Sequence, residues 1–197
     1  MAECASLSYT LEGIDLGCSA GMGGVKTLYL INEADVTIEI DRKGTDSAGL
    51  PKVKTITLKG PNKFKEFKFR KGTASMTSTY NTDDTGSFSS FTTELALQFS
   101  QMESQKRMQI MAMCYNSLKG VVEDSNGRLW LLGADYPINA SAATGVTGVG
   151  AQEFNGYTVT LKDESTELPY EIDKEKFKIE TMVDQQPAGA GAGTVGA

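Results

Sequence analysis

One stretch constrains the fold more than any other, a polar tract that turns into a strand. Between Thr73 and Thr93, twelve of the twenty-one residues are Ser or Thr. The run that follows alternates, and its apolar face is Phe91, Thr93, Leu95, Leu97 and Phe99. Such alternation is typical of a strand with one buried face. Ser- and Thr-rich segments have good β-propensity but little apolar area, so we expect a polar β-hairpin, the arm, over about residues 72–90.

Strand patterns dominate the rest of the chain. We expect further strands at 27–31, 36–40, 53–58, 64–70, 157–161 and 176–183. The turn residues of "KGPN" (59–62) predict that 53–58 and 64–70 pair as a hairpin. Phe67 and Phe69 share a face there, whereas Phe64 is out of phase, which indicates a bulge or a strand start.

One helix is predicted, over 102–120. Its apolar stripe follows the i, i+3, i+4, i+7 spacing and consists of Met108, Met111, Ala112, Tyr115 and Leu118. Gly120 suits the C-terminal cap. We expect the stripe to be core, with the helix closing one open end or face of a β-sandwich or β-barrel. The alternative is that a Met-rich stripe forms an adaptable binding groove.

Turns and loops complete a single domain over 1–184. Asp124-Ser125-Asn126-Gly127 lies between two apolar β runs and predicts a tight hairpin, in which Asn and Gly supply positive φ. We expect 134–156 to be a long loop and the Gly/Ala segment 185–197 to be a mobile tail. The predicted core includes Leu95, Leu97, Phe99, Met111, Tyr115, Trp130, Val159 and Ile179.

No residue pattern indicates catalysis, a metal or a cofactor. The chain has no histidine, which removes the commonest general base and metal ligand. Its three cysteines, Cys4, Cys18 and Cys114, are odd in number and widely spaced, against a disulfide framework. Glycine-rich segments precede strands and lack the order of a phosphate loop, and Asp83, Asp84 and Asp124 fit turns better than an EF-hand. We therefore expect no catalytic, cofactor or metal site, and no enzyme.

Charge is acidic overall but unevenly placed. The net charge of −6 argues against a protein that grips nucleic acid through its phosphates. A basic stretch at 52–71 contrasts with 153–184, where nine acids face four lysines. These are either two solvated strand faces or complementary surfaces on neighbouring copies. The N-terminus lacks a signal-peptide pattern and no apolar run approaches membrane-spanning length, so we expect synthesis and retention in a cytoplasm.

The order of these features resembles the tail tube (major tail) proteins of tailed bacteriophages. The resemblance covers roughly residues 20–184 and is carried by "SSFTTELALQFSQMESQKRMQIMAMCYNSLKGVVEDSNGRLWLLG" and "TGVTGVGAQEFNGYTVTL". It implies a β-sandwich flanked by a helix, assembling as a virion protein into hexameric rings that stack into a hollow tube with an acidic lumen. It further implies self-association and contacts with other tail proteins, with DNA passing through without specific binding and no membrane. The basic 52–71 stretch departs from a lumen wall, so we expect it outside or between subunits.

Two classes of alternative remain. A tail-terminator, connector-ring or baseplate-hub protein would share the fold but stop at one ring. A host- or sugar-binding β-sandwich module would use the arm as its binding loop, with Tyr80, Phe88 and Phe91 for stacking. In a ring-forming protein, by contrast, the edge strand of the arm would pair with a neighbour's sheet. For a ring-forming protein we therefore expect the arm, residues 72–90, to make the contacts between subunits.

Overall fold

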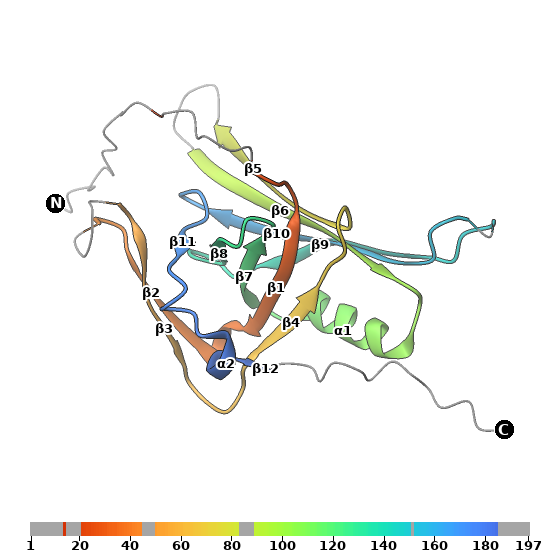
Figure 1. Ribbon diagram of the computed structural model, residues 1–197, viewed down its shortest axis with the longest axis horizontal. Coiled ribbons are helices and arrows are strands. Elements are labelled where there is room, and N and C mark those ends of the chain that lie inside the picture. The colour runs from red at the N-terminus through yellow and green to blue at the C-terminus, as the bar shows by residue number, and fades with distance from the viewer. Residues whose placement is uncertain (1–13, 15–20, 45–49, 83–88, 151, 185–197) are drawn as a thin grey trace.

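The computed structural model describes Ile14 and residues 21–44, 50–82, 89–150 and 152–184. The fold is mainly β with one substantial helix, as the sequence predicts (Figure 1). Its strands are β1 (Val25–Asn32), β2 (Val36–Asp41), β3 (Lys52–Leu58), β4 (Phe64–Lys68), β5 (Ala74–Thr82), β6 (Ser89–Ser100), β7 (Leu118–Asp124), β8 (Leu129–Leu132), β9 (Asn139–Val146), β10 (Gly156–Ser165), β11 (Glu171–Ile172) and β12 (Val183–Asp184). The helices are α1 (Ser104–Tyr115), the single turn α2 (Ile179–Met182) and a 3-10 turn at Glu33–Asp35.

The strands form three layers. A six-stranded sheet in the order β11-β8-β7-β1-β4-β12 lies in the middle. A four-stranded antiparallel sheet, β5-β6-β10-β9, covers one of its faces, and the β2–β3 hairpin lies on the other side (Figure 1). The middle sheet is therefore buried on both faces, which explains the near-continuous apolar runs in β1, β7 and β8.

The first core lies between the two large sheets. Leu28 and Val122 of the middle sheet meet Leu97 and Val159 of the four-stranded sheet, and all four side chains are fully buried. Ile110 of α1 joins this cluster at one end. Of the predicted core residues, Leu95, Leu97 and Val159 are confirmed as buried, while Phe99 and Trp130 are partly buried against this core.

The second core lies on the other face of the middle sheet. Tyr29 and Phe64 surround Phe177, with ring centroids 5.2 and 5.1 Å from it. Val36 and Ile56 of the β2–β3 hairpin close this cluster, and Ile179 packs against it partly buried. Phe64 is out of phase with Phe67 because it begins β4 and packs into this second core, whereas Phe67 packs against the first.

The predicted hairpin between 53–58 and 64–70 is wrong. β3 pairs with β2, and β4 pairs instead with β1 and, in parallel, with β12. Residues 59–63 carry the chain from the outer hairpin into the middle sheet. The Gly and Pro residues at 59–62 correctly indicate that the chain changes direction there. They do not indicate whether the strands on either side pair with each other.

The predicted helix forms, but the prediction had the wrong buried face. Ile110 and Met113 are its buried residues, whereas Met108 is 60% exposed and Tyr115 is 79% exposed. Met111, also expected in the core, is exposed as well. The helix ends at Tyr115, and Gly120 lies inside β7, where Leu30 and Ile138 leave no room for a Cβ. Ala112 is exposed too, so the stripe within α1 faces solvent, while Leu118 lies beyond the helix in β7 and is buried.

Two other predictions about the chain need correction. Residues 134–156 are not one long loop, because β9 occupies Asn139–Val146 and pairs with β10. The strand expected at 176–183 is a short loop, the turn α2 and the two-residue β12. The sequence of β9 does not predict a strand, because several of its residues are small and have low β-propensity. Hydrogen bonding to β10 stabilises it as a strand.

The turn after β7 forms where the sequence predicts. Gly127 has φ +77°, while Asn126 does not take positive φ. The Asp124 carboxylate accepts the backbone N–H groups of Asn126 (2.8 Å) and Arg128 (2.9 Å) and the indole N–H of Trp130 (3.3 Å). Asp124 is thus a turn former, as expected. Asp83, Asp84 and the segment 185–197 lie outside the described residues.

Candidate self-assembly surface

The Ser/Thr-rich tract forms one face of a sheet. In β6, Leu95 and Leu97 point into the core, so the residues between them point outward. Strand register places the neighbours of those residues on the same outward face. This face, here called the polar wall, consists of Ser75, Thr77, Thr79, Asn81, Ser90, Thr92, Glu94, Ala96, Gln98, Thr158, Thr160, Lys162, Glu164, Ala142 and Thr144.

The polar wall carries little charge. Glu94, Lys162 and Glu164 are its charged residues. Lys162 Nζ lies 2.7 Å from a carboxylate oxygen of Glu164, and this contact raises the pKa of the lysine. The three charges sum to −1. A partner would therefore meet mostly hydroxyl groups and one unbalanced carboxylate on the wall.

Both edges of the four-stranded sheet are open in the described part of the chain. β5 is one outer strand and β9 the other. Seven of the eight residues of β9 are exposed. Exposed edge strands present unpaired backbone groups that can add a strand from another chain. A strand from another copy could therefore pair with the sheet at either β5 or β9.

The arm is less independent than the sequence suggested. β5 pairs with β6 along its whole length, from Ala74↔Leu97 to Thr82↔Ser89. Ser78 and Thr93 hydroxyls lie 2.8 Å apart, and the Asn81 amide donates to Thr92 at 2.8 Å. Most of the arm is thus part of the sheet, and only the outer edge of β5 is left to pair with a neighbouring copy.

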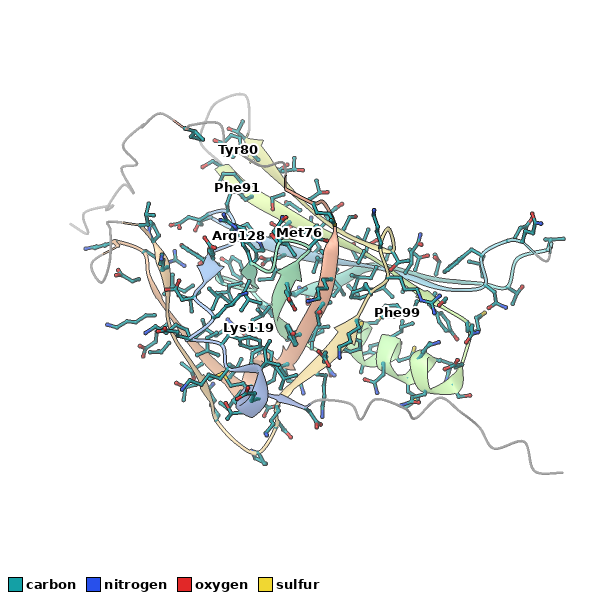
Figure 2. The ribbon with its side chains drawn as sticks, in the orientation of Figure 1. Met76, Tyr80, Phe91, Phe99, Lys119 and Arg128 are labelled. Carbon is teal, nitrogen blue, oxygen red and sulfur yellow. The ribbon has the colours of Figure 1, made fainter. Side chains whose placement is uncertain are left out.

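Aromatic side chains lie toward the far end of the arm. Tyr80 and Phe91 stack with centroids 5.1 Å apart, and Tyr80 is 55% exposed. Figure 2 shows them at one end of the β5–β6 pair, with Phe99 at the other end. The two rings are tilted by 51° to each other, so each contacts the other and does not stand apart as a separate stacking platform. Phe88, the third aromatic residue expected here, lies outside the described residues.

Part of the predicted charge complementarity is satisfied within the chain. Lys52 Nζ lies 3.5 Å from Asp173, and Lys65 Nζ lies 2.5 Å from Asp184. These pairs join the basic 52–71 stretch to the acidic 153–184 stretch of the same molecule. Lys52 and Lys65 thus have acidic partners within their own chain, and a contact between the two stretches on neighbouring copies stays a prediction.

A buried polar cluster lies at the end of β10, and sequence reasoning missed it. Asp163 is 3% exposed, and its Oδ1 has no partner among the described residues. Burial raises the pKa of Asp163 to about 6, with Asp135 and Glu164 adding to the effect and the Gly133 N–H and Lys119 opposing it. The alternation in "YTVTLKDES" was the available signal, since it places Asp163 on the same face as Val159 and Leu161.

The neighbouring carboxylate of Asp135 behaves in the opposite way. Burial alone would raise its pKa, but the Thr166 backbone N–H (2.9 Å), the Thr166 hydroxyl (2.8 Å) and the Arg42 guanidinium lower it. Tyr170 donates to Glu167 beside them. These contacts tie the β2–β3 layer, through Arg42, to the loops that flank β8 and β10.

Other kinds of site find no support in the described residues. Within them, no group of three or more Cys, Asp or Glu side chains is arranged to hold a metal ion. Nor is any described helix long and apolar enough to cross a membrane. Comparisons with models of known protein families, with curated protein sequences and with solved structures found no match to this chain. The surfaces described above therefore carry the functional argument.

Proposed function

We propose that this chain is a tail tube subunit of a tailed bacteriophage. Copies close into rings of six, and the rings stack into the conduit through which DNA is ejected. The observation that carries this proposal is the polar wall, a broad, nearly uncharged sheet face of hydroxyl side chains that ends in two open strand edges.

The wall suits the lining of a DNA channel. DNA carries a dense row of phosphates, and proteins that grip it do so through Lys and Arg. Here Lys162 is paired with Glu164, and Glu94 lies directly opposite it in the register. A face with a slight excess of negative charge repels phosphates weakly and offers them no cation to bind, so DNA can slide along it.

Strand directions in the sheet allow rings to close. Successive strands in the order β5-β6-β10-β9 are all antiparallel, so β5 and β9 run in opposite directions. When a second copy is rotated about a ring axis, its β9 therefore meets β5 of the first copy in antiparallel orientation. Head-to-tail contacts of this kind generate closed rings. The β2–β3 layer, with the lysines of β3, then faces away from the channel.

Negative-stain electron microscopy of the purified chain tests the proposal. Tubes of stacked rings are the expected result. Single rings would favour a tail-terminator, connector-ring or baseplate-hub role. Protein that stays monomeric at high concentration would overturn the proposal in favour of a binding module.

A charge-reversal variant tests the placement of the wall. Glu94→Lys with Glu164→Lys replaces two negative charges of the wall by two positive ones in each copy, and assembled variants should then retain short duplex DNA in a salt-sensitive manner. The matched control is Glu175→Lys with Glu180→Lys, two exposed acids in the layer on the other side of the middle sheet. Equal DNA retention by both variants would contradict the assignment of the wall to the channel.

A further inference from the structure

The helix α1 has an apolar face with nothing packed on it in the described part of the chain. Met108, Met111 and Tyr115 recur at i, i+3 and i+7, so they lie along one side of the helix. That side is opposite the one that buries Ile110 and Met113. Nine of the twelve helix residues are exposed, which is unusual for a helix that has to be held by packing. This Met/Tyr face fits a partner that covers it.

A second uncovered apolar surface lies at the end of the β9–β10 hairpin. Figure 1 shows this hairpin projecting from the body and reaching past the end of α1. Val149 is 100% exposed near its end, and Val146 and Phe154 are 47% and 39% exposed. We call Val146, Val149 and Phe154 the hairpin tip. Exposed apolar residues gathered on a projecting element are a common mark of an interaction site.

Hydrogen bonds within the hairpin help to order its tip. A Glu153 carboxylate oxygen accepts the Val149 N–H at 2.6 Å, and the Glu153 N–H donates to the Gly150 carbonyl at 3.1 Å. At the base, the Asn155 carbonyl accepts the Gln101 N–H at 2.8 Å. A preformed tip loses little conformational entropy on docking, so its apolar area is available to stabilise a contact.

The charges of the two surfaces are complementary. Between Thr147 and Asn155 the sequence has one charged residue, Glu153. The helix Ser104–Tyr115 has two, Lys106 and Arg107, and no acid, although Lys106 Nζ already lies 3.2 Å from a carboxylate oxygen of Glu103. Arg107 lies one turn before Met111, at the border of the Met/Tyr face. The base of the hairpin contacts α1 of its own chain through β9, whereas its end extends past α1 (Figure 1), where a neighbouring copy can meet it.

We propose that the hairpin tip of one copy docks on the Met/Tyr face of α1 in a neighbouring copy. This inference rests on the proposed function, because it names the contact by which assembled copies hold one another outside the polar wall. Methionine side chains adapt to irregular partners, which suits a face that receives Val149 and Phe154. The contact joins two different surfaces, so it propagates from copy to copy.

A disulfide between copies tests the contact directly. Cys114 is exposed on α1 beside Tyr115, and Val149→Cys adds a thiol to the hairpin tip. In a background with Cys4→Ser and Cys18→Ser, mild oxidation of the assembled protein should give a ladder of covalent oligomers on a non-reducing gel. The ladder should disappear with Cys114→Ser, and with Lys71→Cys in place of Val149→Cys. The same ladder from Lys71→Cys would overturn the proposal, because it would reflect unspecific oxidation.

Mixing two single-thiol chains shows whether the link is between copies. One chain carries Val149→Cys and Cys114→Ser, and the other keeps Cys114 alone. The expected product is a covalent dimer that contains one chain of each kind. A monomer with an internal disulfide in the unmixed Val149→Cys protein would overturn the proposal, because the tip would then reach its own helix.

Charge insertion separates this inference from the proposed function. Tyr115→Lys and Val149→Lys should each weaken assembly about tenfold or more in sedimentation velocity, which corresponds to losing an apolar contact of ordinary strength. Leu168→Lys, at a similarly exposed apolar residue elsewhere, is the matched control and should assemble like the wild type. If the wild type assembles and both variants assemble equally well, this inference fails and the proposed function stands. If the wild type never assembles, both fail.

Discussion

Replacing Asp163 by Asn should stabilise the protein at neutral pH. The carboxylate is buried, one of its oxygens has no partner among the described residues, and burial raises its pKa from 3.8 to about 6. In the unfolded chain the same group titrates near its ordinary value. Between pH 4 and 6 the folded state therefore binds more protons than the unfolded state, so this group lowers the free energy of unfolding as pH rises.

The size of the effect follows from the shift in pKa. A difference of roughly two pH units corresponds to about 3 kcal/mol, which is an upper value because the buried site can relax around the charge. Asn is neutral at every pH, and its carbonyl oxygen can still accept the Gly133 N–H. Asp163→Asn should therefore be more stable than the wild type by about 1–3 kcal/mol at pH 8, and by almost nothing at pH 4.

Urea unfolding at pH 8, 6 and 4, followed by the fluorescence of Trp130, measures this difference. The experiment is best done in the Tyr115→Lys background, so that unfolding is not coupled to assembly. Asp135→Asn is the control with the opposite sign: hydrogen bonds lower the pKa of Asp135 below 3.8, so its replacement should destabilise at pH 8 and nearly as much at pH 4, the loss fading only below that pH. An Asp163→Asn protein that is less stable at pH 8, or a gain that persists at pH 4, would refute the reasoning.

Three further predictions concern the fold and the open edge. Leu97→Ala removes a fully buried side chain and should cost about 2–5 kcal/mol in urea unfolding, whereas Ala96→Ser next to it on the polar wall should change stability little. Gly156→Ala should lower the melting temperature sharply, because a Cβ there would lie 2.1 Å from the Phe99 carbonyl oxygen; a normal melting temperature would mean that the start of β10 can shift. Hydrogen exchange should find the β5 amides that face β6 slow in the monomer, while those on the outer edge become slow only on assembly. An outer edge that is equally protected in both states would exclude β5 from the ring contact.

Local patterns in the sequence predicted much of the fold. Leu95, Leu97 and Val159 alternate with polar neighbours and were assigned to the core correctly, because a half-buried strand leaves that signature. The turn at Gly127 was also correct, since few residues accept its positive φ. Pairing between distant segments was not predictable in this way. β3 could have paired with β4 by turn chemistry, and only the three-layer packing selects β2 instead.

The candidate surfaces were harder to predict than the core. The apolar stripe of α1 was read as core because most helices in globular proteins bury their apolar face, but Met108 and Tyr115 lie on the exposed side. Asp163 alternates with its neighbours onto the same buried face as Val159 and Leu161, but aspartate is so seldom buried that the pattern alone does not predict it. The arm was recognised by composition, yet its strand β5 proved to be paired within the chain. The sequence pattern alone does not distinguish an apolar face that packs within its own chain from one that is available to a second copy.

The alternation in β6 has a consequence for how such a protein can change over time. Leu95 and Leu97 hold the sheet to the middle layer, while Glu94, Ala96 and Gln98 contribute to the polar wall and not to the core. Substitutions at the second set leave the packing untouched, so the chemistry of the wall can drift from one descendant to another without the fold being lost. Residues that pack the core and residues that form the wall therefore alternate along one strand, and one set can be substituted without disturbing the other.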